Sequence, residues 1–395
     1  MARNRQVALI FDAAKPYDRK IISGVAAYVR EVGTWGLYVE EDPLERLPDL
    51  RTWQGDGIIA NFDDRRVAAV RGLKVPVVGI GGGYGWYDPA MGIPYFSSDN
   101  RAIARMVAEH FIERGFTRLA YYGCPRTRVN RWSEERAEAF AERAAEAGLT
   151  CATYAGRGER ARRWSELQAR LCAWLAGLSR PIGIMAANDL RARHVLEACR
   201  TIGLRVPDEV AVVGVDNDEM ICELTHPPLS SVEQGARQMG YQAAALLDRL
   251  MARRKAGRLR FVIAPQGIVT RRSSDVLAVE DSDVAHAVRF IRERACDGIR
   301  VSDVVREVAI SRSTLEKRFA TMLGRTLHEE IRRTRIERVR QLLTTTTLTL
   351  KEIAGKAGLR HVPFMTTLFR RFTGHTPAEY RRWSYGGRVR GRGVK

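Results

Sequence analysis

Two stretches near the C-terminus decide how the last third of the chain folds: VSDVVREVAISRSTLEKRF at residues 301–319 and LKEIAGKAGLRHVPFMTTLFRRF at residues 350–372. In each, a short amphipathic segment meets a tight turn. A second segment follows, with polar and basic residues on one side and Leu or Phe on the other. This pattern predicts a helix-turn-helix, the arrangement that lays its second helix in a DNA major groove. Two such units in one subunit would read two adjacent grooves.

The charge of the chain is concentrated around these two stretches. The whole chain carries 65 Lys and Arg against 46 Asp and Glu, a net charge of +19. Residues 281–395 hold 25 against 12, a net of +13, which leaves 40 against 34, or +6, for residues 1–280. A solubilising arginine-rich surface would also be basic. Excess charge that coincides with two helix-turn-helix patterns instead favours double-stranded DNA as the partner.

Residues 1–270 show a different pattern, in which short apolar runs alternate with amphipathic helices. The predicted strands are at residues 7–11, 37–40, 57–61, 75–80, 118–122, 151–154, 182–186, 210–215 and 261–263. Such β-α-β alternation predicts parallel, doubly wound sheets with helices on both faces. Nine strands are too many for one compact sheet, so we expect two lobes. The predicted class is therefore α/β and two-lobed, followed by an all-α domain with two helix-turn-helix motifs.

Composition also predicts the domain boundaries. We expect the α/β domain at residues 1–270, a polar linker at 271–283 and the helical domain at 284–385. The Gly- and Arg-rich tail at 386–395 is expected to be disordered and to add attraction to phosphates that does not depend on base sequence.

Several classes of protein are excluded. The six cysteines are scattered without a C-x-x-C pair, so we expect buried thiols in a reducing compartment and no metal site. The first apolar run ends after five residues at Asp12, too short for a signal peptide, and no stretch reaches the length of a membrane helix. No catalytic constellation is recognisable. The sequence therefore predicts a cytoplasmic protein without a cofactor or a membrane contact, and not an enzyme.

Acidic and amide residues follow the predicted strands, where the ligands of doubly wound sheets bind. They occur at residues 61–64 and 98–100 and include Asp12, Asn188, Asp189, Asp216 and Asn217. Their oxygens and amides suit the hydroxyls of a neutral polyol. Aromatic residues that could cover a sugar ring are Phe62, Tyr84, Trp86, Tyr87 and Trp132. Alternatively, each Asp or Asn caps the helix after it. This alternative is weakest at residues 216–218, where no strong helix pattern follows at once.

The chain also resembles known families. Residues 310–319, 352–354, 369–372 and 374–381 resemble the DNA-binding domain of the AraC family, and residues 187–189, 212–216 and 229–240 look like the sugar-binding domain of LacI-type repressors and periplasmic binding proteins. Few families join these modules in this order. Nearly the whole chain is similar to XylR-type xylose-operon activators, through residues 14–19, 40–42, 61–64, 191–194 and 311–319.

The resemblance assigns roles to individual residues. The LacI-type pattern implies ligand contacts at Arg136, Asn188 and Asp216, and the position after the first strand adds Asp12. Asp189 and Asn217 are included as their neighbours. In the first reading helix the AraC pattern places Ser313, Glu316 and Lys317 toward base edges, with Arg312 and Arg318 nearer phosphate.

The second reading helix departs from the family pattern. Here the resemblance implies DNA contacts by Pro363, Thr366 and Thr367, to which we add Arg370. Leu359 stands in place of the usual aromatic residue, and Thr367 stands where the family often has Arg. The second unit is therefore expected to read bases less strongly than the first.

The combined resemblance implies a sugar-responsive transcriptional activator. Its partners would be double-stranded operator DNA, a small sugar effector, a second copy of the chain in a homodimer, and RNA polymerase. The implied effector is D-xylose, while another pentose or a small polyol remains open as the alternative.

Overall fold

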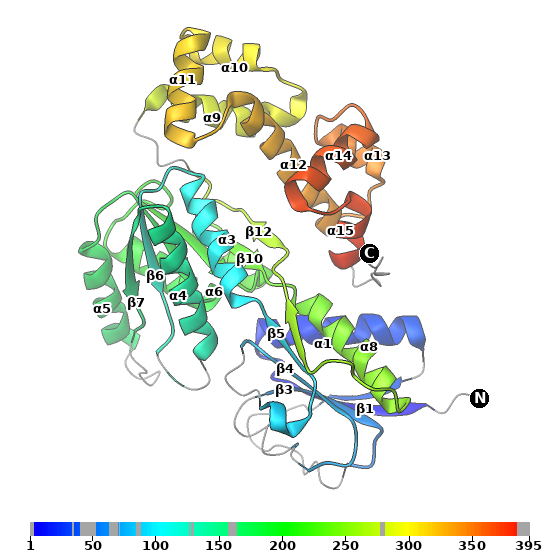
Figure 1. Cartoon of the computed structure of the whole chain (residues 1–395). Coiled ribbons are helices and arrows are strands. Elements are labelled where there is room, and N and C mark those ends of the chain that lie inside the picture. Colours follow the sequence, from blue (N-terminus) through cyan, green and yellow to red (C-terminus); the bar gives the residue numbers. More distant parts are fainter. Residues whose placement is uncertain are drawn as a thin grey trace. The chain divides into compact units, whose positions relative to one another are not determined.

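The structure is a computed structural model that describes residues 4–33, 35–39, 53–62, 70, 72–83, 88–125, 127, 130–156, 164–276 and 281–384. The chain divides into two compact units. Residues 1–109 and 117–275 form the first unit, and residues 110–116 and 276–395 form the second. The first unit contains two sheets flanked by helices and the second is helical, which confirms the predicted fold class (Figure 1).

The first lobe is built on a six-stranded sheet with the order β11-β5-β4-β3-β1-β2, in which every paired strand is parallel. Its strands are β1 (Arg5–Ile10), β2 (Trp35–Val39), β3 (Gly57–Asn61), β4 (Val77–Gly81), β5 (Tyr95–Ser98) and β11 (Arg260–Ile263). Strands β3 and β4 are buried along almost their whole length, because helices or loops cover both faces.

Helices α1 (Pro16–Val32) and α8 (Ala236–Met251) pack side by side against this sheet (Figure 1). Two glycines set their distance. A Cβ atom on Gly24 would lie 1.9 Å from the carbonyl oxygen of Arg237, and one on Gly240 would lie 2.0 Å from that of Ile21. Neither distance is possible for a real side chain, so the close crossing of α1 and α8 requires glycine at both positions.

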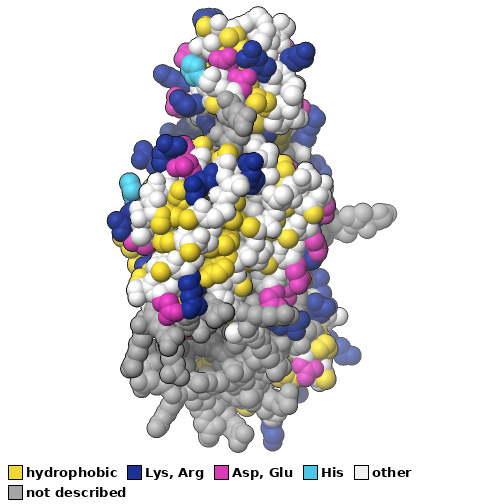
Figure 2. Space-filling model, turned by 90° about the vertical axis from the view of Figure 1, so that its left-hand side faces the viewer, with side chains coloured by type: hydrophobic (Ala, Val, Ile, Leu, Met, Phe, Trp, Pro, Cys, Tyr) yellow, Lys and Arg dark blue, Asp and Glu magenta, His cyan; other side chains and the backbone are white. Residues whose placement is uncertain are grey.

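The second lobe has a six-stranded sheet with the order β12-β10-β9-β8-β6-β7, parallel except for β12 against β10. Its strands are β6 (Arg118–Tyr122), β7 (Thr150–Tyr154), β8 (Ile182–Ala186), β9 (Val210–Val215), β10 (Ser230–Glu233) and β12 (Gly267–Val269). Its helices are α3 (Asn100–Ile112), α4 (Arg131–Glu146), α5 (Trp164–Ala176), α6 (Asp189–Thr201) and α7 (Glu219–Leu224). Hydrophobic side chains gather on the side of this lobe that Figure 2 shows, where α5 lies beside the edge strand β7.

The chain crosses between the lobes three times, at residues 98–100, 233–235 and 264–266. Backbone hydrogen bonds join the crossings, from the amide of Asp99 to the carbonyl of Ile263 (2.9 Å) and from the amide of Gln266 to the carbonyl of Glu233 (2.7 Å). The three segments therefore lie side by side and form one hinge region.

The second unit is a set of helices around two small cores. The helices are α9 (Ser282–Arg294), α10 (Val301–Val308), α11 (Arg312–Leu323), α12 (Leu327–Thr345), α13 (Leu350–Lys356), α14 (Val362–Thr373) and α15 (Pro377–Ser384). Leu315 and Phe319 of α11 lie in one core, and Met365 and Phe369 of α14 lie in the other. The long helix α12 contributes apolar residues to both, so it joins the two helix-turn-helix units (Figure 1).

A buried carboxylate anchors α12. Glu330 is fully buried and accepts hydrogen bonds from Nε of Arg325 (2.6 Å) and Nε of Arg333 (3.1 Å). Burial opposes its ionisation, but the two guanidinium groups outweigh this and lower the pKa of Glu330 to about 2.

The structure adds elements that the sequence patterns did not predict. Strands β5, β10 and β12 were missed. Helix α7 was missed too, because it begins directly after Asp218 although no strong helix pattern follows residues 216–218. These elements are three to six residues long, too short to show a clear periodicity. The first unit extends to Asp275, since Ser273 donates to the carbonyl of Val212 (2.6 Å). Within the described residues, no helix is long and apolar enough to cross a membrane.

Candidate ligand cleft and nucleic-acid interface

Arg136 of helix α4 is the centre of a buried polar network in the first unit. Its side chain is 2% exposed. The guanidinium donates from Nε to Oδ1 of Asn100 (2.9 Å), from Nη1 to the carbonyl of Ala187 (2.6 Å) and from Nη2 to Oε1 of Gln234 (3.1 Å). The ring of Trp132, one turn earlier, lies 4.8 Å from the guanidinium carbon. A fixed guanidinium beside an aromatic face is a suitable contact for a sugar.

Gln234 connects this network to the hinge, because it lies in the second crossing between the lobes. Its Oε1 also accepts a hydrogen bond from Ser98 Oγ (2.9 Å) in the first crossing, and its Nε2 donates to Oδ1 of Asp216. The carboxamide of Gln234, which belongs to the second crossing, therefore contacts the first crossing, Arg136 and Asp216. A ligand that bonds to Arg136 or Asp216 would lie next to this carboxamide and to the crossing segments.

Asp216 sits at the end of strand β9 in a constrained position. Its φ angle of 115° lies in a region that residues other than glycine rarely adopt. Lys20 of α1 donates to its backbone carbonyl (2.7 Å) and forms an ion pair with Glu233. Burial raises the pKa of the Asp216 carboxyl to about 6, although the positive charges of Arg136 and Lys20 oppose this rise.

The other predicted cleft residues have structural partners. Asn188 caps helix α6 by accepting from the amide of Arg191 (3.0 Å). Asp189 is 1% exposed and accepts from Ser231 Oγ (2.5 Å) and the amide of Asp218 (2.8 Å). Asn217 Oδ1 accepts from Nη1 of Arg271 (3.0 Å). Asn188 and Asp189 follow Ala187, whose carbonyl binds Arg136, so they border the network while their own side-chain bonds serve the fold.

Asp12 lies in the turn before helix α1. Its carboxylate accepts from the amide of Ala14 (3.0 Å) and pairs with Lys15 (3.2 Å), and its own amide donates to Oδ2 of Asp18 (2.8 Å). Asn61 donates to the other oxygen of the Asp18 carboxylate (2.6 Å). The structure thus joins Asp12 to the ends of β1 and β3, but no described bond joins it to Arg136 or Asp216.

Gln234, Ser98 and Asn100 were not among the individual contacts chosen from the sequence. Residues 98–100 form a polar stretch in the sequence, and residue 234 falls within the stretch 229–240 that carries the LacI-type resemblance. Their convergence depends on the crossings between lobes. Of the aromatic candidates, Phe62 is 5% exposed and packs on Tyr95 with ring centres 5.6 Å apart. Asp63, Asp64, Tyr84, Trp86 and Tyr87 lie outside the described residues.

The first helix-turn-helix of the second unit is formed by α10 and α11. Ser311 caps α11 by accepting from the amide of Thr314 (3.2 Å), and Leu315 and Phe319 face the core. Arg312, Ser313 and Lys317 are exposed, and Glu316 beside them accepts from Nε of Arg312 (2.9 Å). The structure therefore brings these four predicted contacts onto one face of α11.

Arg318 points elsewhere. Its Nη1 lies 3.4 Å from Asp281 and 3.1 Å from Asp283, at the start of α9. The predicted phosphate contact of Arg318 would have to compete with these two carboxylates.

The second helix-turn-helix is formed by α13 and α14. A reciprocal cap between Thr349 and Glu352 begins α13, and Pro363 lies in the first turn of α14, where its missing N–H costs nothing. Pro363, Thr367 and Arg370 are exposed, whereas Thr366 is partly buried. Phe364, which the sequence reading did not select, is 49% exposed.

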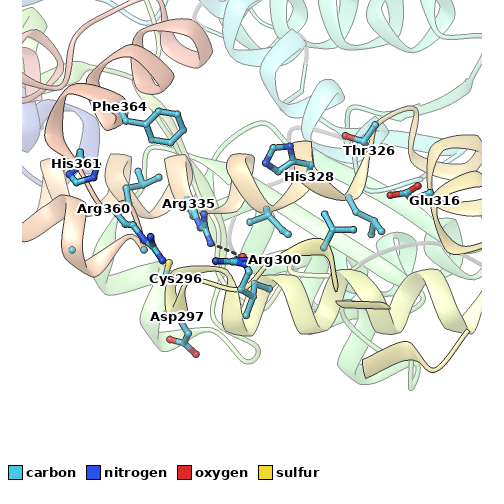
Figure 3. Close-up of a pocket in the computed structure, with 18 of the residues that line it drawn as sticks. Cys296, Asp297, Arg300, Glu316, Thr326, His328, Arg335, Arg360, His361 and Phe364 are labelled. Carbon is cyan, nitrogen blue, oxygen red and sulfur yellow. Dashed lines mark hydrogen bonds between the residues drawn. The ribbon is translucent and has the colours of Figure 1, made fainter. Parts of the chain in front are cut away.

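A groove of about 1490 Å³ lies between the two helix-turn-helix units, with α12 along it (Figure 3). Arg312 and Glu316 line it from α11, Lys351 lines it from α13, and Phe364 lines it from α14. Arg335 of α12 is held by hydrogen bonds to the carbonyls of Ala295 (2.8 Å) and Ile299 (2.9 Å). The further basic lining residues are Arg300, His328, Arg360 and His361. A basic groove bordered by both reading helices suits the backbone of a duplex.

Three family descriptions match consecutive parts of the chain. Residues 6–101 match the XylR N-terminal domain, residues 108–274 match a periplasmic binding protein-like domain, and residues 304–382 match a helix-turn-helix domain. The last match includes both helix-turn-helix units.

Curated relatives extend the similarity over nearly the whole chain. The xylose operon regulatory protein of Escherichia coli strain K12 is 38% identical over 381 residues, 96% of this chain and 97% of that protein. The xylose operon regulatory protein of Haemophilus influenzae is 36% identical over 378 residues, 95% of this chain and 98% of that protein. The chain belongs to the family of xylose operon regulatory proteins.

Structural similarity supports this membership. A solved structure of the xylose-binding transcription activator XylR is 37% identical, with a TM-score of 0.64, and the match covers 96% of this chain and 98% of that one. Like other members of the xylose operon regulator family, the chain is a DNA-binding transcriptional regulator and not an enzyme, as the sequence predicted. In the described residues, no group of His, Cys, Asp or Glu is placed to hold a metal ion.

Proposed function

We propose that this regulator binds a pentose, D-xylose, in the cleft between its two lobes, and that binding raises its affinity for operator DNA upstream of xylose-utilisation genes. The names of the relatives supply the sugar, since they are xylose operon regulators and the solved relative is called xylose-binding. The observation that carries the proposal is the bonding of Gln234, which links Arg136 and Asp216 to the crossings between lobes.

The chemistry of the cleft favours a neutral polyol. The Asp216 carboxylate accepts hydrogen bonds from hydroxyl groups, Arg136 donates to hydroxyl and ring oxygens, and Trp132 offers an apolar face. Gln234 bonds to both Arg136 and Asp216, and Asn100 bonds to Arg136. A sugar would replace these bonds with its own and so favour one arrangement of the hinge.

The effect on DNA is a population shift. A sugar that binds one hinge arrangement more tightly raises its population, and DNA affinity rises if that arrangement also spaces the reading helices correctly. We propose a homodimer that places four helix-turn-helix units on repeated operator elements, contacts RNA polymerase and acts in the cytoplasm.

The direct test is a thermal-shift series with D-xylose, L-arabinose, D-ribose, D-glucose and xylitol. We expect the largest stabilisation with D-xylose, about 2.7 kcal/mol at a hundredfold excess over Kd. Asp216→Ala should weaken sugar binding by about 1.5–3 kcal/mol, because a charged hydrogen bond is lost. Asp208→Ala is the matched control, an exposed aspartate in the same lobe. A response to another pentose or to xylitol would select the alternative effector, and an unchanged response of Asp216→Ala would refute the proposed cleft.

Coupling is tested on the full-length chain by operator binding with and without sugar. We expect tighter binding with sugar, by about five- to 150-fold, and the same factor when DNA is titrated against sugar. Equal affinities in both titrations would separate the cleft from the DNA-binding unit.

A further inference from the structure

The two reading helices present different chemistry at their first turns, the part of a recognition helix that meets base edges. At the start of α14, Val362, Pro363 and Phe364 follow one another, and their side chains contain only carbon and hydrogen. Phe364 is 49% exposed and lines the groove between the two units (Figure 3). No side chain of this turn can donate or accept a hydrogen bond.

Helix α11 begins in the opposite way. Its first turn exposes Arg312 and Ser313. The next turn exposes Lys317 beside Glu316, whose carboxylate accepts from Nε of Arg312 at 2.9 Å, where the matching positions of α14 hold Thr366 and Thr367. Each of these side chains donates or accepts hydrogen bonds. The carboxylate of Glu316 is an acceptor on the exposed side of the helix, where it borders the same groove.

The major groove offers a distinct partner for each type of surface. The thymine C5-methyl is the apolar group that the major groove displays, and it is read by apolar contact. The cytosine N4 amino group is the donor that a Glu carboxylate accepts from, and a Lys binds guanine O6 and N7. Phe364 would thus contact methyl groups, while Glu316 and Lys317 would contact the edges of a C·G pair.

We infer that the two units divide the reading of one operator: α11 selects C·G pairs by hydrogen bonds, and α14 selects thymines by packing Phe364, beside Pro363, on their methyl groups. This rests on the proposed operator binding. It identifies Phe364 as a specificity residue, in addition to the Thr366 and Thr367 contacts expected from the sequence. Arg370, exposed two turns further along α14, remains available for phosphate.

The test uses the full-length protein with D-xylose and a duplex selected from a random library. Each thymine is then replaced singly by deoxyuridine, which removes only the methyl group. At the part of the operator that α14 contacts, we expect the affinity for the protein to fall about fourfold for each methyl group removed, the value of one buried CH2 group. The same replacement at the part of the operator that α11 contacts should not change the affinity.

Two phenylalanine variants assign the effect to its residue. Phe364→Ala should bind the thymine and deoxyuridine duplexes equally, with an unchanged melting temperature because the side chain is half exposed. Phe364→Leu should keep the discrimination, since an apolar contact remains. Phe372→Ala is the matched control, a 44% exposed phenylalanine at the other end of α14 and outside the groove lining, and it should behave as the parent.

A parental protein that binds both duplexes equally, or a Phe364→Ala variant that still discriminates between them, would overturn the inference. A selected operator without thymine in the second sub-site would do the same. A protein that selects no sequence would overturn the proposed function as well. This outcome differs from specific binding that is insensitive to the methyl group.

Discussion

The proposed sugar site around Arg136 and the proposed DNA face around α11 differ in how their polar side chains are placed. In the cleft, Arg136 and Gln234 are 2% and 3% exposed, and they bond to each other and to their neighbours. On the DNA face, Arg312 has a side chain that is 66% exposed, and Lys317 is also exposed. The residues around Arg136 are bonded to one another, whereas Arg312 and Lys317 have largely exposed side chains. We therefore expect few, large effects in the cleft and many small, additive effects on DNA.

Salt should separate the two regions most strongly. Each Lys or Arg that neutralises a phosphate releases counterions, so raising salt from 50 to 200 mM should weaken operator binding by about a thousandfold if some six phosphates are contacted. Binding of an uncharged sugar should change by less than twofold over the same range. Operator titrations by fluorescence anisotropy and sugar titrations by calorimetry measure the two slopes. A flat operator slope would contradict a phosphate-binding groove.

Arg136→Ala should be the most damaging change in the cleft. It removes the donor to Asn100 Oδ1 and to the Ala187 carbonyl in a buried site, and it leaves Gln234 Oε1 with Ser98 alone. This should lower the free energy of unfolding by about 2–4 kcal/mol and remove the sugar response. Urea denaturation measures the first effect and thermal shift the second. Arg131→Ala, an exposed arginine on the same helix, is the control and should stay within about 0.5 kcal/mol of the parent. Equal stability of both variants would show that the network does not support the fold.

Acidification should weaken sugar binding. With a carboxyl pKa of about 6, Asp216 becomes protonated below that pH and loses acceptor capacity, so sugar affinity should fall by up to about tenfold per pH unit below pH 6. The folding stability of the protein should change in the opposite direction. The folded pKa lies above the unfolded value of about 3.9, so the stability contribution of Asp216 is greatest below pH 4 and is lost as pH rises from 4 to 6. Calorimetry at pH 5, 6 and 7.5 measures the affinity, and urea denaturation at pH 4, 5 and 6 measures the stability. Asp216→Asn should remove its share of both dependences and leave that of Asp189, whose pKa is also raised by burial.

The smallest difference is expected between two neighbours on α11. Lys317→Ala should cost about 1–3 kcal/mol of operator affinity if its ammonium group meets a base edge. Arg318→Ala should cost less than about 0.5 kcal/mol, because its guanidinium is paired with Asp281 and Asp283 and such exposed pairs are weak. Titrations of both variants on one operator decide the question. A larger loss for Arg318 would mean that DNA replaces its carboxylate partners, as the sequence reading expected.

Local patterns in the sequence predicted the fold well where elements are long. The helix-turn-helix units follow from the spacing of apolar residues around Leu315 and Phe369, and the two sheets follow from buried runs such as residues 210–215. Strand β10 was not predicted, because its sequence, Ser-Ser-Val-Glu, has little apolar character. It forms because β9 and β12 pair with it on either side, which no local pattern records.

The candidate site was harder to predict because its partners come from distant segments. Arg136 and Asp216 were predicted from the sequence. The carboxamide of Gln234 that joins them could not be predicted, because its position depends on how the three crossings pack in the folded chain. Asn188 shows the reverse, since its bond to the amide of Arg191 is the helix cap that had been kept as the alternative. Whether a side chain faces a ligand or its own helix depends on angles that residue type alone does not fix.

The glycine crossing of α1 and α8 has a consequence for re-engineering the sensor. Gly24 and Gly240 leave no room for even one methyl group between the helices, while α8 begins immediately after the hinge residue Gln234. We therefore expect α1 and α8 to behave as one rigid pair of helices, because their backbones are in contact at both glycines. Attempts to retarget the cleft to a new sugar can vary the residues around Trp132. They should leave these two glycines untouched, because any side chain there would force the two helices apart.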